Sequence, residues 1–353
     1  MAKDGRTIAS IERLREARVL CIGDVMLDHY VYGVSDRLSP EAPVPVLAID
    51  SETHNLGAAG NVLRNLAALG AGMSFVSVVG NDAAGREVQN LLAELDGAEI
   101  HVLVQPQRVT TVKTRFVAVN QHLLRADRES AAPLSPYTRD DLFRLVRELV
   151  TSHTVVAISD YAKGVLTDGV ALEIIKTAHE AGAKVVVEPR GGDHIRYHGA
   201  DILMPSRREL AQATGLPVAN AAEIAVAARA LIDRCGLGAV FVQLGREGVL
   251  LVDPHEALAF GSGAASDHYD PGGVEDAALA VLAAGLGAGF ELVATARLAA
   301  LAIGIAGTKT GTAVVSAGEL AAALAGEERS EEAGAALRVE MTPQSRGRRQ
   351  REA

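Results

Sequence analysis

Tryptophan is absent from this chain of 353 residues, and aromatic side chains make up only 3% of it. Proteins that hold single-stranded nucleic acids stack the bases on aromatic rings. The formal net charge of −10 would in addition repel a phosphate backbone. We therefore expect no binding to nucleic acid, and we expect small molecules as partners.

Cysteine and long hydrophobic runs are also scarce. Cys21 and Cys235 are the only two cysteines, too few and too far apart to suggest a disulfide framework. The polar N-terminus has no apolar signal-peptide segment. The longest apolar run, residues 277–290, is shorter than a bilayer span and contains glycines. We expect a cytoplasmic protein without membrane association, in which this run is a buried helix.

Hydrophobic side chains make up 48% of the chain, enough for one large core or two modest ones. Residues 18–23 have the length and apolar content of a buried strand. Residues 57–61 then open a helix that runs to Leu69, and residues 73–79 return as a strand. Further helix and strand patterns alternate along the chain without repeats, which predicts an α/β fold.

Two segments do not follow this alternation. Prolines at positions 40, 43 and 45 exclude a helix and a central strand from the first segment. The second segment, residues 109–124, alternates polar and apolar side chains as a solvated antiparallel pair does. We expect the two to form a lid, at about residues 29–50 and 108–126, on one domain of residues 1–325. Residues 326–353 contain little apolar surface and are expected to be disordered.

The segment formed by residues 269–276 gives the first functional signal. Pro271, Gly272 and Gly273 interrupt regular structure, so Asp276 should lie at the N-terminus of the helix that follows. Unpaired backbone N–H groups at such an end favour an anion, and a carboxylate there can accept a proton from a hydroxyl. This combination suits phosphoryl transfer. Taken by itself, however, an aspartate in the first turn of a helix is more often a capping residue.

Three segments carry a family resemblance: residues 23–28, residues 37–46 with their three prolines, and residues 159–164 (Ser-Asp-Tyr-Ala-Lys-Gly). With them the chain resembles the ribokinase-like (phosphofructokinase-B) sugar kinases, and among these the heptose-7-phosphate kinases of lipopolysaccharide core synthesis. The resemblance covers residues 17–324. It implies a doubly wound α/β fold with a small β lid that often mediates homodimerisation. It also implies ATP and Mg²⁺, and phosphate transfer to the anomeric hydroxyl of D-glycero-D-manno-heptose 7-phosphate. The chain resembles the stand-alone type of this kinase.

The resemblance also implies the roles of single residues. Asp276 would activate the sugar hydroxyl, beside an anion hole formed by Gly273, Val274 and Glu275. The sugar phosphate would be bound by Asp24, Asp28, Gly57, Asn61, Asp160 and Lys163, and Arg37, Arg115 and Arg125 could attract its phosphate. The nucleotide would be bound by Ser206, Glu209, Gln243, Gly245 and Gly248, and Glu209 would contact Mg²⁺ through water.

Several of these positions depart from the family pattern. The asparagine before Glu209 is replaced by Ser206, a threonine by Gln243, an asparagine of a late helix by Ala300, and a glycine of the catalytic loop by Glu275. If position 275 requires a left-handed backbone, Glu275 costs about 1 kcal/mol. If its carboxylate points toward phosphate oxygens, repulsion adds about 1 to 4 kcal/mol per charge pair.

Three functions therefore stay open. The first is an active heptose-phosphate kinase. The second is a sugar-phosphate-binding or regulatory homologue with impaired catalysis, because the substitutions concentrate in the nucleotide half. The third is a kinase for another sugar, which would share the fold but would not need the proline-containing segment.

Overall fold

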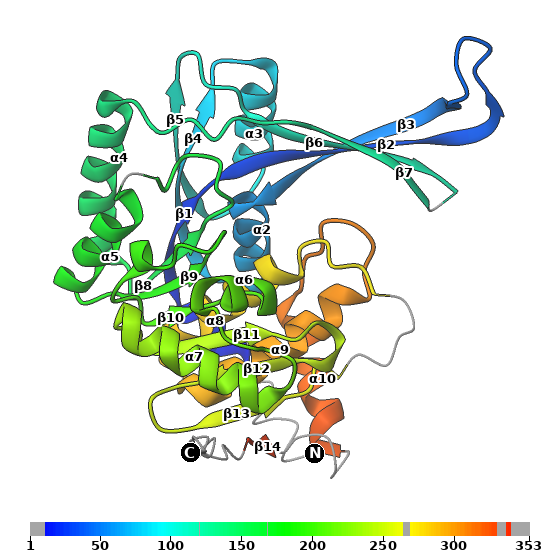
Figure 1. The fold of residues 1–353 in the computed structure, drawn as a ribbon. Coiled ribbons are helices and arrows are strands. Elements are labelled where there is room, and N and C mark those ends of the chain that lie inside the picture. The colour runs from blue at the N-terminus through cyan, green and yellow to red at the C-terminus, as the bar shows by residue number, and fades with distance from the viewer. Residues whose placement is uncertain (1–10, 120, 168, 264–268, 330–336, 340–353) are drawn as a thin grey trace, which may run out of the picture.

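A ten-stranded sheet forms the centre of the molecule (Figure 1). The computed structural model describes residues 11–119, 121–167, 169–263, 269–329 and 337–339. Within these residues, the strands from β5 to β11 in the spatial order are parallel, and β12, β13 and β14 extend the edge in antiparallel fashion. The spatial order is β14 (Leu337–Arg338), β13 (Ala257–Phe260), β12 (Val249–Val252), β11 (Ala239–Gln243), β10 (Ile202–Leu203), β9 (Lys184–Glu188), β8 (Val155–Ser159), β1 (Arg18–Gly23), β4 (Gly72–Gly80) and β5 (Ala98–Gln105).

Helices cover both faces of this sheet. Side chains of the central strand β1 alternate between the two layers: Val19 and Cys21 belong to one hydrophobic cluster, and Leu20 and Ile22 to the other. The first layer contains α2 (Ala59–Leu69), α3 (Ala83–Ala93), α8 (Val274–Gly287), α9 (Leu292–Gly307) and α10 (Ala317–Arg329). The second contains α4 (Pro136–Leu149), α5 (Val170–Glu180), α6 (Arg207–Thr214) and α7 (Ala221–Cys235). The predicted α/β fold, wound on both faces of the sheet, is confirmed.

A separate four-stranded sheet projects from the body as a lid, drawn in blue and teal in Figure 1. Its spatial order is β3 (Pro45–Ala58), β2 (Val25–Leu38), β6 (Thr111–Ala118) and β7 (Gln121–Arg128). The two segments that we expected to join do so through the parallel pair β2 and β6. Pro40 and Pro43 lie between β2 and β3, and Pro45 is the first residue of β3, where proline removes no ladder bond of a central strand.

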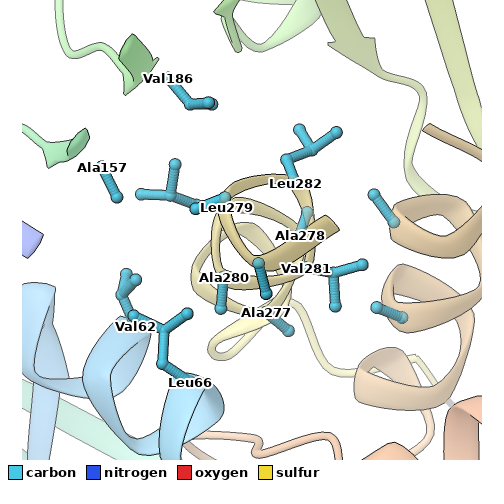
Figure 2. Packing of buried hydrophobic residues seen from close by; sticks show 14 of the residues in the cluster. Val62, Leu66, Ala157, Val186, Ala277, Ala278, Leu279, Ala280, Val281 and Leu282 are labelled. Carbon is cyan, nitrogen blue, oxygen red and sulfur yellow. The ribbon is translucent and has the colours of Figure 1, made fainter. Parts of the chain in front are cut away.

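Helix α8 is buried nearly all round, as its alanine-rich sequence predicts. Figure 2 shows its residues 277–282 between α2, which contributes Val62 and Leu66, and the sheet, which contributes Ala157 and Val186. Small side chains on this helix let its neighbours approach closely on every side. The core thereby fixes the position of the helix N-terminus, where Asp276 lies.

The C-terminal segment is only partly described. Helix α10 continues through Arg329, beyond the boundary that we expected at residue 325, and β14 pairs with β13. Residues 330–336 and 340–353 of the tail for which we expected disorder lie outside the described residues. In the described part of the chain, no helix combines the length and the apolar character needed to cross a bilayer.

Candidate functional site

A cavity of about 200 Å³ lies where the lid meets the body of the molecule. We call it the acceptor cavity. Its lining includes Asp28, Lys113 and Arg115 from the lid, and Tyr161, Arg190 and Asp276 from the body. Tyr161 follows β8 and Arg190 follows β9, so the cavity lies at the carboxyl ends of the parallel strands. Ligands of open α/β sheets bind at this edge.

The N-terminus of α8 supplies an anion site to this cavity. Gly273 has a left-handed backbone with φ of 76°, and a Cβ at this position would lie 2.7 Å from the backbone nitrogen of Ala313, so only glycine fits. Among the described residues, the backbone N–H groups of Gly273, Glu275 and Asp276 have no hydrogen-bond acceptor, and that of Val274 is 3.4 Å from the Pro271 oxygen. Free N–H groups at a helix N-terminus attract phosphate.

The carboxylate of Asp276 is buried beside these N–H groups. Asn61 Nδ2 donates to its Oδ2 and the Tyr161 hydroxyl donates to its Oδ1, each at 2.9 Å. Burial raises the pKa of Asp276 from 3.8 to about 6, against these two hydrogen bonds, and the charges of Glu275 and Asp28 add to the rise. Asp276 is therefore ionised at neutral pH, with a pKa in the range that suits a general base.

Asn61 orients Asp276 because its own amide is fixed. Arg64 donates to the Asn61 oxygen at 3.1 Å, so the amide nitrogen turns toward acceptors, namely Asp276 and the Ala313 carbonyl oxygen. Asn61 lies in the first turn of α2, next to α8. The residue that we predicted to contact substrate thus also contacts the predicted base.

Asp24 and Asp160 hold the loop that carries Tyr161. The oxygens of Asp24 accept from the backbone N–H groups of Tyr161, Lys163 and Val165, and Asp160 accepts from that of Ala162. Ala162 has a left-handed φ of 55°, which costs about 1 kcal/mol and persists because these bonds hold both sides of it. We expected both aspartates to contact the sugar, and this stays a prediction; in the structure both are buried and accept hydrogen bonds from protein groups.

Lys163 also lies apart from the predicted substrate role. Its Nζ is 2.7 Å from a Glu129 oxygen, and the residue is not among those that line the acceptor cavity. Asp160 makes two further contacts, accepting from Arg196 and from the Tyr197 hydroxyl. Each of the two charges has a protein partner of opposite charge, Glu129 at 2.7 Å from Lys163 and Arg196 at 2.6 Å from Asp160.

Asp28, by contrast, faces the acceptor cavity. It accepts from Arg115 on the neighbouring lid strand and, at 3.0 Å, from the Thr312 hydroxyl. Gly57 makes room for it, because a Cβ at position 57 would lie 2.5 Å from the Asp28 carboxylate. Of the sugar-side residues that we predicted, Asp28 lines the cavity, and Gly57 and Asn61 each contact a side chain that lines it.

Two cations of the lid line the same cavity. Arg115 was one of three arginines that we considered for the sugar phosphate; Arg125 instead pairs with Asp127, and Arg37 is exposed near the end of β2. Lys113 was missed, although it lies two residues from Arg115 on one strand and hence on the same face. Its ammonium is 5.4 Å from the centre of the Tyr161 ring, and burial lowers its pKa.

The predicted nucleotide residues lie on the neighbouring strand ends. Ser206 and Glu209 form a capping box at the start of α6, and Ser206 forms a bridge with Gln243 at the end of β11. Gly245 and Gly248 both have positive φ in the turn that follows. These residues therefore form one group. Arg190 links it to the acceptor cavity, because Arg190 Nη1 lies 3.9 Å from Glu209 Oε1.

Glu275 does not have a left-handed backbone, and its negative charge is paired with a cation. Its φ is not in the left-handed region, where among the residues of this loop only Gly273 lies, so the expected backbone penalty is absent. Its carboxylate lines the cavity and accepts from Arg190 at 3.1 Å. The position of Arg190, two residues past a buried parallel strand, was the signal from which sequence reasoning could have found it.

The described residues contain no group of three or more His, Cys, Asp or Glu side chains arranged to hold a metal ion. Mg²⁺ in kinases is bound mainly by substrate phosphates and water, with one or two carboxylates, so such a group is not required. Both oxygens of Glu209 already accept hydrogen bonds, from Gly191, and from the backbone and hydroxyl of Ser206. Contact with Mg²⁺ through water, as predicted, fits this residue better than direct ligation.

Known proteins share both sequence and fold with this chain. The model of the pfkB family carbohydrate kinases matches residues 16–317. The bifunctional protein HldE of Paramagnetospirillum magneticum is 46% identical over 292 residues, which cover 83% of this chain and 60% of that protein. The HldE protein of Rhodospirillum rubrum is 44% identical and is covered to 58%. The chain thus spans about 60% of the length of these relatives.

Solved structures match at lower identity. Phosphofructokinase-2 from Escherichia coli in complex with potassium superposes with a TM-score of 0.74 at 19% identity, over 88% of this chain and 98% of that one. Ribokinase of Arabidopsis thaliana complexed with ribose and ATP has a TM-score of 0.67 at 20% identity, over 87% and 98% of the two chains. At such identity the likeness concerns the fold.

Proposed function

This chain belongs to the pfkB family of carbohydrate kinases, and we propose that it transfers the terminal phosphate of ATP to the anomeric hydroxyl of D-glycero-D-manno-heptose 7-phosphate. The resemblance to ribokinase-like sugar kinases that we inferred from the motifs is confirmed, as is the fold. The choice of substrate is our inference. It rests on the three motif segments and on the cations of the acceptor cavity.

One observation carries the proposal: a buried carboxylate with a raised pKa lies beside free backbone N–H groups in a cavity. In this geometry Asp276 removes the proton from the attacking hydroxyl. The N–H groups of Gly273 and Glu275 stabilise charge on the phosphoryl group in transfer. Tyr161 and Asn61 keep the carboxylate oriented throughout.

The acceptor cavity suits a sugar that carries a phosphate at its far end. Asp28 offers acceptors to sugar hydroxyls, and Lys113 and Arg115 offer cations to a phosphate monoester. An unphosphorylated sugar would leave the Lys113 ammonium without an anionic partner. This is the feature that favours a sugar phosphate over a neutral sugar.

ATP and Mg²⁺ are the proposed cosubstrates. The bare N–H groups of α8 fit a phosphate, and the group formed by Ser206, Glu209, Gln243, Gly245 and Gly248 lies at the adjacent strand ends. Mg²⁺, when bound with the nucleotide, neutralises part of the phosphate charge. Glu209 would hold one of its water ligands.

We further propose a cytoplasmic homodimer that works in the synthesis of ADP-heptose for the lipopolysaccharide core. The lid favours a dimer because it exposes apolar side chains that a second copy could cover. These are Val34, Leu38, Ile49 and Leu124, with exposed fractions of 47%, 67%, 55% and 60%. We propose that the kinase domain, expected to end at residue 325, extends to the end of α10 at Arg329.

An assay of ATP consumption with heptose 7-phosphate tests the proposal, with the Asp276→Asn variant as control. Turnover by the wild type that the substitution abolishes is the expected result. Binding of the sugar phosphate without turnover in either protein would instead support the impaired homologue. Turnover only with ribose or fructose 6-phosphate would identify a kinase for another sugar.

A further inference from the structure

Arg190 is surrounded by carboxylates from three different elements. Its guanidinium lies 3.3 Å from Glu188 at the end of β9, 3.1 Å from Glu275 in the first turn of α8, and 3.9 Å from Glu209 in α6. It also lies over the ring of Tyr161, 4.4 Å from the ring centre. Arg190 thus touches the catalytic loop, the nucleotide group and the loop that orients Asp276.

Among these acids, Glu275 is the one that a ligand can replace. Glu188 is 2% exposed, and burial together with Asp276 and Glu275 raises its pKa far above the usual value, which favours the neutral form. Glu209 is fixed by its capping box. The Glu275 side chain is 33% exposed and lies on the cavity wall, and Arg190 is the cation that pairs with it among the described residues.

Glu275 is also next to the free N–H groups of Gly273 and Asp276, where we propose that a phosphoryl group is bound. A carboxylate at that point would repel a phosphate unless a cation balances it. Arg190 is that cation. Its planar fork of five N–H donors retains donors for a phosphate oxygen, because the contact to Glu209 is longer than a hydrogen bond.

We propose that Arg190 binds the terminal phosphoryl group of the nucleotide, and that Glu275 is its counter-ion when no nucleotide is bound. On nucleotide binding the phosphate takes the Arg190 contact, and the Glu275 carboxylate turns to solvent. The inference rests on the proposed kinase function. It explains how the catalytic loop can contain the acidic residue Glu275 and still bind a phosphate at the N-terminus of α8.

The test compares binding of adenylyl imidodiphosphate, a non-hydrolysable analogue of ATP, with binding of ADP, both with Mg²⁺, by calorimetry. Arg190→Gln removes the charge but keeps a polar side chain that can donate a hydrogen bond. We expect it to weaken the analogue at least 10-fold and ADP less than 3-fold, because only the analogue has the third phosphate. Arg190→Lys, which keeps the charge, should stay within about 5-fold of the wild type.

Glu275→Gln in the Arg190→Gln background is the second arm. Removal of the unbalanced carboxylate should recover at least 3-fold of the lost affinity for the analogue. Arg144→Ala, which breaks an exposed ion pair with Asp141 on α4, is the control for a change of charge and should leave both affinities unchanged.

The outcomes separate this inference from the proposed function. Equal weakening of the analogue and ADP, equal effects of the Gln and Lys variants, or no recovery in the double variant would each overturn the role of Arg190. A wild-type protein that binds neither nucleotide and turns over no sugar phosphate would overturn the kinase function, and this inference with it.

Discussion

Replacement of Asp276 by asparagine should make the protein more stable and nearly inactive at once. The carboxylate is only 3% exposed, and its pKa rises from 3.8 to about 6 on folding. A rise of this size means that the folded protein loses about 3 kcal/mol when the carboxylate is ionised. Asparagine carries no charge, so Asp276→Asn should raise the free energy of unfolding at pH 8 by up to about 3 kcal/mol.

The local hydrogen bonds allow this substitution. The amide oxygen of an asparagine can accept from Asn61, and its nitrogen can donate to the Tyr161 oxygen, since a phenol is both donor and acceptor. The pH dependence has a defined sign. Below about pH 3, Asp276 is protonated in both the folded and unfolded states and the two proteins should be equally stable. The advantage of the variant should grow between pH 4 and pH 6 and stay constant above.

Denaturant unfolding at pH 4, 6 and 8 measures the stability, and ATP consumption measures the activity. Turnover should fall by about 10² to 10⁴ when the general base is lost. Asp233→Asn, at an exposed position of α7, is the matched control and should change neither quantity. The reasoning about burial would be refuted if the variant were less stable than the wild type at pH 8, or if its gain in stability were as large at pH 4 as at pH 8. Retained turnover would refute the role of Asp276 as the base.

Three further substitutions test the site and its support. Tyr161→Phe removes a hydrogen bond that lowers the pKa of Asp276, so the acidic limb of the pH–rate profile should move upward by about one pH unit; an unmoved limb would contradict this. Lys113→Ala should raise KM for the sugar phosphate about 10-fold with KM for ATP unchanged in steady-state kinetics, and a reversed pattern would place Lys113 with the nucleotide. Ala58→Gly should leave the free energy of unfolding equal or raise it by up to about 1 kcal/mol in chemical denaturation, because Ala58 has a φ of 54°; a loss above 1 kcal/mol would show that its methyl group matters more than its backbone.

The fold could be predicted because its signals are local and redundant. The alternation of helix and strand patterns, the three prolines of the lid, and the alanine-rich run of α8 each follow from residue type and spacing over a few positions. The helix N-terminus at Asp276 was predicted from Pro271, Gly272 and Gly273 in the same way. The end of α10 at Arg329 was not, because residues 326–329 (Gly-Glu-Glu-Arg) contain no apolar side chain that would indicate packing against the core.

The candidate site could be predicted less well, because it depends on which charges meet across the fold. Asp24 and Asp28 look alike in the sequence, four residues apart, yet Asp24 accepts from backbone N–H groups and Asp28 faces the cavity. Likewise, Glu275 in the sequence alone predicts an impaired anion site, because its partner Arg190 is 85 residues away along the chain. Such pairings depend on which residues the tertiary structure brings together, and a local sequence pattern does not show this.

The root of the lid has a mechanical consequence. Strand β1 ends at Gly23 and β2 begins at Val25, so a single residue, Asp24, joins the central sheet to the lid. Its backbone is bonded to Ser159 and Ala59, and its side chain holds the Tyr161 loop. The part of the lid next to the central sheet is therefore held in place through both the backbone and the side chain of Asp24. The ladder between β2 and β3 is continuous from Val25 to Tyr32 and is first interrupted by a register shift at Gly33, so Asp28 lies in the regular part of the lid next to this anchor.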